Sequence, residues 1–242
     1  MPEPVAGTMG AQPVEFANWG THAYVRLVRA PVVYPPQADT RLLAQAMTDA
    51  RIPCGGRVLD VCTGTGVLAI HASRAGAGTV TAVDISRRAV LSARFNCGIR
   101  EIDVELVHGH FATVLGDRRF DVVLANPPYV PSPADTTSRG AARAWDAGPE
   151  GRSALDQLSG LLPLLLDHRG VALIVHSVMC GPDRTLAQLR DGGLKAAIVA
   201  RRLIPFGPVM RQRAAWLISS GLIAPNQQRE ELVVIRADRT ES

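Results

Sequence analysis

The chain has 242 residues, of which 47% are hydrophobic and 20% charged, and its formal net charge is +4. This composition excludes a largely disordered chain, and the length suits a single α/β domain. No apolar run reaches the roughly 18 to 20 residues that a membrane-spanning helix needs. Residues 1–30 lack the charged-then-apolar pattern of a secretory signal. We therefore expect a cytoplasmic protein with no membrane association.

The cysteines and basic residues indicate neither a metal site nor a particular partner. Cys54, Cys62, Cys97 and Cys180 are widely spaced and form no Cys-x-x-Cys pair, so we expect reduced thiols and no metal site. Nearly all the positive charge is arginine, because Lys195 is the only lysine. The positive excess is compatible with a nucleic-acid partner, but it is more typical of ordinary solubility.

The N-terminal part of the chain is expected to precede the main core. Residues 1–20 are rich in Pro, Gly and Ala without periodicity, and they predict a flexible N-terminal tail. Residues 21–242 then form one domain. Its early part holds an extended Val-Val-Tyr-Pro-Pro segment and a helix with an apolar face, for which Asp39 or Thr40 would be the N-cap.

A strand, a small-residue loop and a helix follow in the order typical of a nucleotide-binding turn. The strand covers residues 57–61, the loop is Cys-Thr-Gly-Thr-Gly over residues 62–66, and the next strand ends at Asp84. Gly64 and Gly66 would let the backbone pass close to a ligand. Asp84 lies eighteen residues beyond Gly66, close to the spacing expected for an acid that binds ribose hydroxyls. The combination predicts nucleoside binding.

The remaining pattern continues the alternation of strands and helices. Further strands are predicted over 104–108, 120–125, 171–175, 195–203 and 231–236, and helices over 87–97, 151–166 and 183–190. Gly160 and Pro163 should break or kink the second of these helices, and residues 139–150 should form a loop or lid beside the pocket. We predict an α/β, Rossmann-like sheet of seven mostly parallel strands with about six helices on both faces, and no second core.

The predicted strand over residues 120–125 runs directly into Asn126-Pro127-Pro128-Tyr129. Prolines cannot continue a sheet ladder, so Asn126 is expected at the carboxyl edge, where open α/β sheets bind ligands. The Asn126 side-chain oxygen and the Pro127 carbonyl could each accept one N–H of a planar amide or amino group, with Tyr129 packed against its flat face. Alternatively, the four residues are a simple turn.

These motifs resemble the class I S-adenosylmethionine-dependent methyltransferases, and among them the HemK-like N5-glutamine methyltransferases of release factors. The pattern Asp60-x-Cys62-x-Gly64-x-Gly66 is similar to their first motif, Asp84 to their ribose acid, and Asn-Pro-Pro-Tyr to their catalytic motif. The segment from Tyr34 to Thr40 and the loop from Trp145 to Arg152 are also similar. The resemblance covers roughly residues 25–237.

The resemblance implies S-adenosylmethionine as the cofactor and assigns roles to particular residues. The implied catalytic residues are Asn126, Pro127 and Tyr129. The implied cofactor-binding residues are Thr40, Asp60, Cys62, Gly64, Gly66, Asp84, His110, Phe111 and Asn126. No counterpart of the long helical N-terminal domain of bacterial members is present, so the layout is closer to short archaeal and eukaryotic members. The eukaryotic forms work with a small zinc-binding activator protein.

Two positions depart from the family pattern. Cys62 stands where the family usually has its first glycine, and a cysteine fits there if φ is negative. We therefore expect altered packing rather than lost cofactor binding. His110 stands where many members place the acid that reads the adenine amino group, so adenine recognition would depend more on the backbone of Phe111 or on a water.

The sequence leaves the methyl acceptor open. A protein substrate, the glutamine side chain of a class I release factor, is favoured by the Tyr34 segment and the Trp145 loop. The alternative is an amino group of a base flipped out of a nucleic acid, because the same two acceptor oxygens would hold it equally well. A second alternative is a non-catalytic scaffold that only binds the cofactor.

Overall fold

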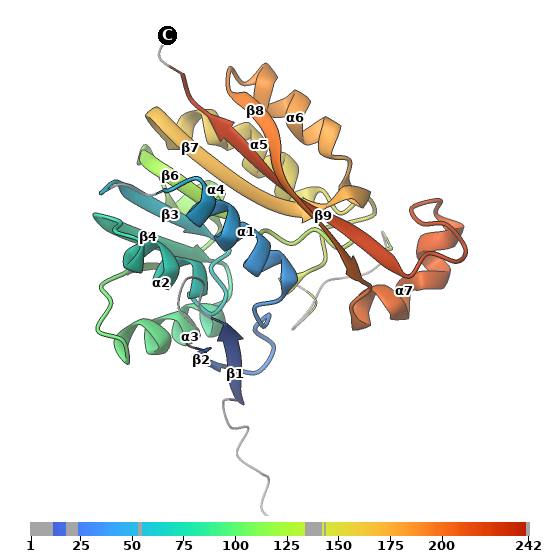
Figure 1. The fold of residues 1–242 in the computed structure, drawn as a ribbon, viewed down its shortest axis with the longest axis horizontal. Coiled ribbons are helices and arrows are strands. Elements are labelled where there is room, and N and C mark those ends of the chain that lie inside the picture. Colours follow the sequence, from blue (N-terminus) through green and yellow to red (C-terminus); the bar gives the residue numbers. More distant parts are fainter. Residues whose placement is uncertain (1–11, 18–23, 53–54, 134–141, 143, 241–242) are drawn as a thin grey trace, which may run out of the picture.

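The computed structural model describes residues 12–17, 24–52, 55–133, 142 and 144–240. Its centre is a seven-stranded sheet (Figure 1). The strands are β3 (Arg57–Val61), β4 (Thr79–Asp84), β5 (Glu105–His108), β6 (Phe120–Ala125), β7 (Leu166–Ser177), β8 (Lys195–Pro205) and β9 (Arg229–Asp238). They lie in the order β5-β4-β3-β6-β7-β9-β8, with β3 to β7 parallel and β9 antiparallel to both of its neighbours. The predicted fold class is confirmed.

Helices cover both faces of this sheet (Figure 1). The helices are α1 (Ala38–Asp49), α2 (Val67–Arg74), α3 (Arg87–Gly98), α4 (Phe111–Val114), α5 (Ser153–Leu165), α6 (Pro182–Asp191) and α7 (Pro208–Ser219). Helices α1 to α3 contact one another in succession on one face, and α4 to α6 do so on the other. Because both faces are covered, the central strands β3 and β6 are buried except for Arg57 and the half-buried Asp121.

The strand order places a ligand crevice at the carboxyl ends of the central strands. The chain runs outward from β3 through β4 to β5, then returns to the other side of β3 to form β6. At such a switch point, the loops after adjacent strands diverge and leave a gap. Asn126, directly after β6, and the loop after β3 therefore border the same crevice.

Two helices differ from their predicted form. Helix α1 begins one residue before Asp39, with Gln37 as its N-cap, so neither Asp39 nor Thr40 is the cap. Both lie in the first turn instead, because Thr40 Oγ1 accepts a hydrogen bond from Gln37 N at 3.4 Å. Helix α5 continues through Gly160 and Pro163. Pro163 lies in its last turn, where the missing N–H removes only one helical hydrogen bond.

A two-stranded hairpin precedes the sheet and falls partly within the predicted tail. Strands β1 (Gln12–Ala17) and β2 (Tyr24–Arg29) pair antiparallel. The tail expected over residues 1–20 is therefore wrong for the six residues of β1, whose backbone groups pair with β2. The rest of that segment lies outside the described residues, and the expected boundary at residue 21 falls between the two strands.

Helix α7 was not predicted from the sequence and carries a second apolar cluster. It lies between β8 and β9, and its cluster consists of Phe206, Met210, Leu217 and Ile223. The expectation of no second core is therefore wrong. The Pro205–Pro208 stretch is the start of this excursion rather than a simple connection between two strands.

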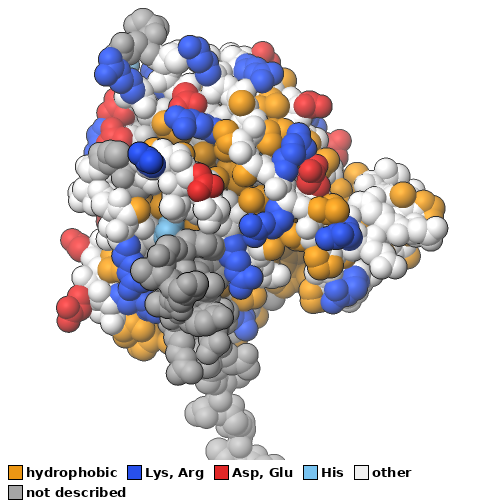
Figure 2. Space-filling view, in the orientation of Figure 1, with side chains coloured by type: hydrophobic (Ala, Val, Ile, Leu, Met, Phe, Trp, Pro, Cys, Tyr) orange, Lys and Arg blue, Asp and Glu red, His pale blue; other side chains and the backbone are white. Residues whose placement is uncertain are grey.

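Charged side chains of both signs are interspersed on the face shown in Figure 2. Several arginines in the described part of the chain form ion pairs, among them Arg57 with Asp121, Arg184 with Glu150, and Arg201 with Glu231. This pairing reduces the charge available to an anionic partner. None of the helices in the described ranges is both long enough and apolar enough to span a bilayer.

Candidate active site

A cavity of about 470 Å³ lies at the carboxyl edge of β3, β4 and β6. Its volume is in the range typical of small-molecule sites. Five of the predicted site residues line it, namely Thr40, Cys62, Gly64, Asp84 and Asn126. The segment before α1 forms the facing wall through Val32, Val33, Tyr34 and Pro36. The structure thus brings together residues from six separate stretches of sequence, 32–40, 62–68, 84–89, 108, 126–128 and 144.

Asp60 holds the glycine loop in place through hydrogen bonds. This side chain is fully buried, and its Oδ2 accepts hydrogen bonds from Thr63 Oγ1 at 2.6 Å and from Ala69 N at 3.1 Å. Burial raises the pKa of Asp60 to about 7, although the two hydrogen bonds oppose the shift. Asp60 does not line the cavity, so it shapes the loop and the start of α2 rather than presenting its carboxylate to open space.

The backbone of the loop is left-handed at three positions. Gly64 and Gly66 have φ of 55° and 80°, and a Cβ on Gly66 would lie 2.9 Å from Ala93 Cβ. Glycine is therefore required at Gly66 both for its φ and for the contact between α2 and α3. Cys62 has φ of 60°, so the expectation that it keeps a negative φ is wrong. The loop imposes a glycine-like conformation on this cysteine.

Asp84 connects the end of β4 to the glycine loop. Its Oδ2 accepts from Gly64 N at 2.9 Å, and its Oδ1 accepts from Ser86 N at 2.8 Å. Burial raises the pKa of Asp84, and the two backbone hydrogen bonds oppose that shift. Each carboxylate oxygen keeps a second lone pair, which a ribose hydroxyl at the cavity wall could use.

Two residues predicted to read adenine do not line this cavity. His110 is the N-cap of α4, where its Nδ1 accepts from Ala112 N at 3.2 Å, and its ring stacks on the buried Phe111. His108, at the end of β5, and the exposed Ile85, directly after Asp84, line the cavity instead. Their positions immediately at or after strand ends are the signal by which the sequence could have identified them.

A second, smaller cavity of about 20 Å³ adjoins the first, and Asn126 borders both. Its walls are Tyr34, Asp39, Asn126, Pro127, Pro128, Tyr129, Val130, Ala144 and Trp145. All three residues predicted to be catalytic are therefore in contact with one space. Asn126 Nδ2 donates a hydrogen bond to Thr40 Oγ1 at 3.2 Å, which leaves the Asn126 oxygen without a protein partner in the described part of the chain.

Tyr129 is held by the carboxylate of Asp39, for which the sequence predicted only a possible role as a helix cap. The Tyr129 hydroxyl donates to Asp39 Oδ2 at 3.1 Å, and the Tyr34 hydroxyl donates to the same oxygen at 3.2 Å. Burial, followed by the charge of Asp39, raises the pKa of both phenols well above its usual value of 10. Both hydroxyls therefore remain donors, and Asp39 joins α1 to the Asn-Pro-Pro-Tyr motif.

The Trp145–Arg152 segment supports the motif from the other side. Val130 N donates to Trp145 O at 2.7 Å, and Ala147 N donates to Val130 O at 3.1 Å. Gly151 packs so closely on the Tyr129 carbonyl that a Cβ would overlap with it. Of the loop expected over 139–150, residues 139–141 and 143 lie outside the described residues.

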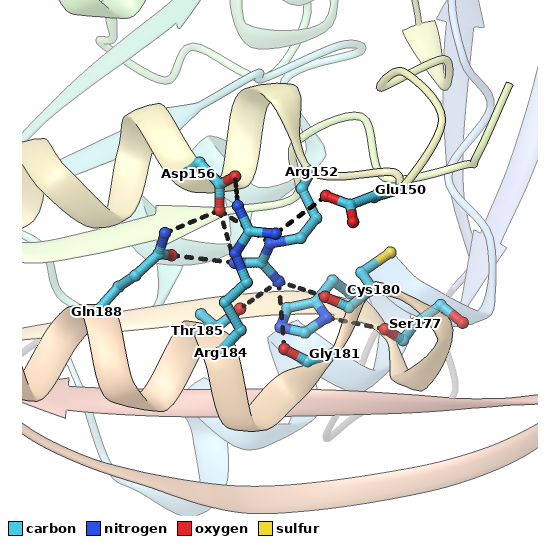
Figure 3. A network of polar contacts seen from close by, with 10 residues as sticks. Glu150, Arg152, Asp156, Ser177, Cys180, Gly181, Arg184, Thr185 and Gln188 are labelled. Atoms are coloured by element: carbon cyan, nitrogen blue, oxygen red, sulfur yellow. Dashed lines mark hydrogen bonds and ion pairs between the residues drawn. The ribbon is translucent and has the colours of Figure 1, made fainter. Parts of the chain in front are cut away.

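Arg152 anchors this support in the body of the protein (Figure 3). Its side chain is 4% exposed and forms an ion pair with Asp156 at 2.7 Å. It also donates to the carbonyl of Cys180, to Thr185 Oγ1 at 3.1 Å and to Gln188 Oε1 at 3.0 Å. These contacts tie the start of α5 to α6, so this arginine has a structural role.

The residues around the larger cavity fit S-adenosylmethionine. Thr65 is 2% exposed and lines the cavity, yet its Oγ1 has no hydrogen-bond partner within the described residues. A polar ligand at the loop would satisfy this hydroxyl. Asp84 offers acceptors for a ribose, and the apolar Ile85 and Leu68 offer surface for a flat base. The described residues contain no cluster of three side chains suited to a metal ion.

The sheet order, the glycine loop and Asp84 together define a class I S-adenosylmethionine-dependent methyltransferase, and comparisons with known proteins agree. The family model "Methyltransferase small domain" matches residues 36–143. The "Putative protein N5-glutamine methyltransferase" of Methanocaldococcus jannaschii is 33% identical over 188 residues, which are 77% of this chain and 93% of that protein. Methyltransferase HEMK2 of Mus musculus is 32% identical over 173 residues, covering 67% of this chain and 80% of that protein.

A solved structure shows the same fold. The E. cuniculi Mtq2–Trm112 complex, described as responsible for methylation of the translation termination factor eRF1, contains a chain that is 23% identical with a TM-score of 0.61. The match covers 86% of this chain and 99% of that chain. On the identity and coverage of the two sequence relatives, this protein belongs to the S-adenosylmethionine-dependent methyltransferase family of the N5-glutamine and HEMK2 type.

Proposed function

We propose that this methyltransferase transfers its methyl group to the side-chain amide nitrogen of a glutamine in a protein, with the Gly-Gly-Gln loop of a release factor as the expected acceptor. The observation that carries the proposal is the hydrogen bond from Asn126 Nδ2 to Thr40 Oγ1. This bond directs the Asn126 oxygen away from Thr40 and leaves it free to accept an N–H from the substrate.

An amide nitrogen is a poor nucleophile because its lone pair is delocalised into the carbonyl group. The protein compensates by position and by electrostatics. Asn126 Oδ1 and the Pro127 carbonyl accept the two N–H groups and draw negative charge onto the nitrogen. Bound S-adenosylmethionine supplies the electrophilic methyl group, and the amide proton leaves to Asn126 or to water. The prolines hold both acceptors at the end of a buried strand.

The smaller cavity favours a side-chain amide over a nucleic-acid base. Between the described residues it offers about 20 Å³, little more than the volume that one water needs. Any acceptor must therefore separate the walls formed by Tyr34 and Trp145. The three heavy atoms of a glutamine carboxamide require less separation than the ring of a flipped adenine or cytosine. Amino methylation of a nucleic acid therefore remains the second candidate, supported by the two acceptors and the net charge of +4.

An activator protein is part of the proposal. The E. cuniculi relative is described as a complex with Trm112. In this chain, Leu91 and Phe95 on α3 and Ile99 at its C-cap follow one another at four-residue spacing, and each is more than half exposed. This apolar stripe lies on a helix that packs against the edge strand β5. A small partner protein that covers the stripe would explain its exposure.

The proposal is tested by offering three acceptors in parallel with isotope-labelled S-adenosylmethionine. The acceptors are a release factor, mixed RNA and mixed DNA, each with and without a Trm112-type protein. We expect label in the release factor alone. A release factor with glutamate in place of the Gly-Gly-Gln glutamine is the matched control, since it lacks only the amide nitrogen, and it should remain unlabelled. Label in RNA or DNA would replace the proposal with the nucleic-acid alternative.

A further inference from the structure

We propose that Asp39 is a positioning residue that acts through Thr40 to fix which end of the Asn126 amide faces the substrate. The inference rests on the proposed function, because it assigns a purpose to the orientation of Asn126. Asp39 comes from α1, 87 positions before Asn126 in the chain. It touches neither of the two oxygens that would accept the substrate N–H groups.

The Asp39 carboxylate is buried and fully occupied as an acceptor. Its side chain is 2% exposed. Oδ1 accepts from Thr40 N at 2.6 Å and from Thr40 Oγ1 at 3.1 Å. Oδ2 accepts from the hydroxyls of Tyr34 and Tyr129 at 3.2 and 3.1 Å. Since a carboxylate can only accept, the Thr40 hydroxyl proton must point to Asp39.

The direction of that proton determines what Thr40 offers to its other neighbours. With its only proton committed to Asp39, Thr40 Oγ1 can act toward them only as an acceptor. One lone pair receives Gln37 N at 3.4 Å, and the other receives Asn126 Nδ2 at 3.2 Å. A flipped Asn126 would bring its oxygen against Thr40 Oγ1 with no proton between the two oxygens. The chain of hydrogen bonds therefore selects one amide orientation.

The selected orientation is the one that the reaction requires. The side-chain oxygen of Asn126 then borders the cavities, where it can accept a substrate N–H. The opposite orientation would present the Asn126 NH₂ group to a substrate NH₂ group, and two donors cannot bond to each other. Asp39 thus contributes to the rate by preorganising an acceptor that is already in place before substrate binds.

The first test measures the orientation directly and needs neither cofactor nor acceptor. The side-chain ¹⁵NH₂ signals of Asn126, assigned by their loss in Asn126→Asp, are followed by hydrogen exchange in the wild-type protein and in variants. We expect one slowly exchanging Asn126 proton in the wild type and in Thr40→Ser, which keeps the hydroxyl. We expect that protection to be lost in Thr40→Val and in Asp39→Asn. Unchanged protection in both of these variants overturns the proposal.

The second test compares kcat with KM for the acceptor at saturating cofactor. Thr40→Val and Asp39→Asn should each lower kcat about tenfold or more with less change in KM, and Thr40→Ser should retain most of kcat. Asp49→Asn, the same substitution at an exposed position of α1, is the matched control and should leave kcat unchanged. Equal losses in Thr40→Ser and Thr40→Val overturn the proposal. If the wild type methylates no glutamine, the proposed function fails, and the exchange measurement still decides the role of Asp39.

Discussion

Asp84 Oδ2 accepts a hydrogen bond from the backbone N–H of Gly64 at 2.9 Å, so the acid at the end of β4 holds the glycine loop after β3 in place. Asp84→Ala removes this acceptor and the carboxylate available to a ribose. We expect it to weaken S-adenosylmethionine binding by about 1.5–3 kcal/mol, measured by calorimetry. Asp103→Ala, which removes an exposed carboxylate, is the control. Equal affinity in the Asp84 variant and the wild type would show that the ribose is bound elsewhere.

Substitutions at Gly151 and Gly148 test how closely the Trp145–Arg152 segment packs against the catalytic motif, because Gly148 serves as the matched control for Gly151. Both have positive φ, 69° and 75°, but a Cβ on Gly148 meets no atom within 4 Å, whereas one on Gly151 overlaps with the Tyr129 carbonyl and lies 2.9 Å from Cys180 Sγ. Gly148→Ala should therefore lower the free energy of unfolding by about 1–2 kcal/mol. Gly151→Ala should lower it by about 2–5 kcal/mol and also slow methyl transfer. Urea unfolding measures the difference, and equal losses would contradict the close packing described for Gly151.

Because the backbone of Cys62 is left-handed, we expect its replacement by glycine to stabilise the protein. Cys62→Gly relieves the strain at φ of 60° and should raise the free energy of unfolding by about 1 kcal/mol, partly offset by the lost packing of the thiol. Gly66→Ala should have the opposite effect, because its Cβ would lie 2.9 Å from Ala93 Cβ. Thermal unfolding of both variants is the measurement. A destabilised Cys62→Gly would mean that the packing of the thiol outweighs the strain.

The raised pKa of the buried Glu230 carboxyl makes the stability of the protein depend on pH. Its side chain is 7% exposed, and burial raises its pKa from 4.5 to about 7 against a hydrogen bond from Ser177, with the Asp39 charge adding to the rise. Between these pH values the folded protein keeps a proton that the unfolded chain releases. The contribution of Glu230 to the free energy of unfolding therefore falls as the pH rises from about 4.5 to about 7, and it is constant above that. Asp60 acts in the same direction.

The variant Glu230→Gln isolates this effect because it has no carboxyl group to ionise. At pH 8 it should be more stable than the wild type, by at most about 3 kcal/mol. Near pH 5 the gain should be much smaller. Urea unfolding at the two pH values makes the comparison. A stability difference that is the same at both would show that the Glu230 carboxyl ionises equally in the folded and unfolded states.

The parts of the site that depend on local sequence could be predicted. The glycine loop and Asp84 follow strands with clear apolar patterns, and the two prolines after Asn126 mark the end of β6. The structure places all of these residues at the carboxyl edge of the sheet. The contacts of Asp39 could not be predicted, because its partner Tyr129 lies 90 positions away and only the packing of α1 against the sheet brings them together.

The features that the sequence did not predict also depend on contacts between distant segments. The only sign of the positive φ of Cys62 is the glycine that the family usually has there, since the hydrogen bonds of Asp60 and Asp84 to the loop join separate segments. Helix α7 was missed because its apolar side chains pack into a small cluster of their own rather than against the sheet. Arg213 on this helix forms an ion pair with Asp146 at 2.6 Å and donates to the Pro131 carbonyl at 2.9 Å. Such contacts between distant segments leave no periodic signal.

The most direct measurement is mass spectrometry of a release factor after incubation with S-adenosylmethionine and either the wild-type protein or Asn126→Ala. We expect the wild type to add one methyl group to the amide nitrogen of the Gly-Gly-Gln glutamine. We expect Asn126→Ala to add none, although its affinity for the cofactor stays within a few-fold of the wild type. Comparable methylation by the variant, or a methyl group on any other residue, would show that Asn126 does not position a glutamine amide for methyl transfer.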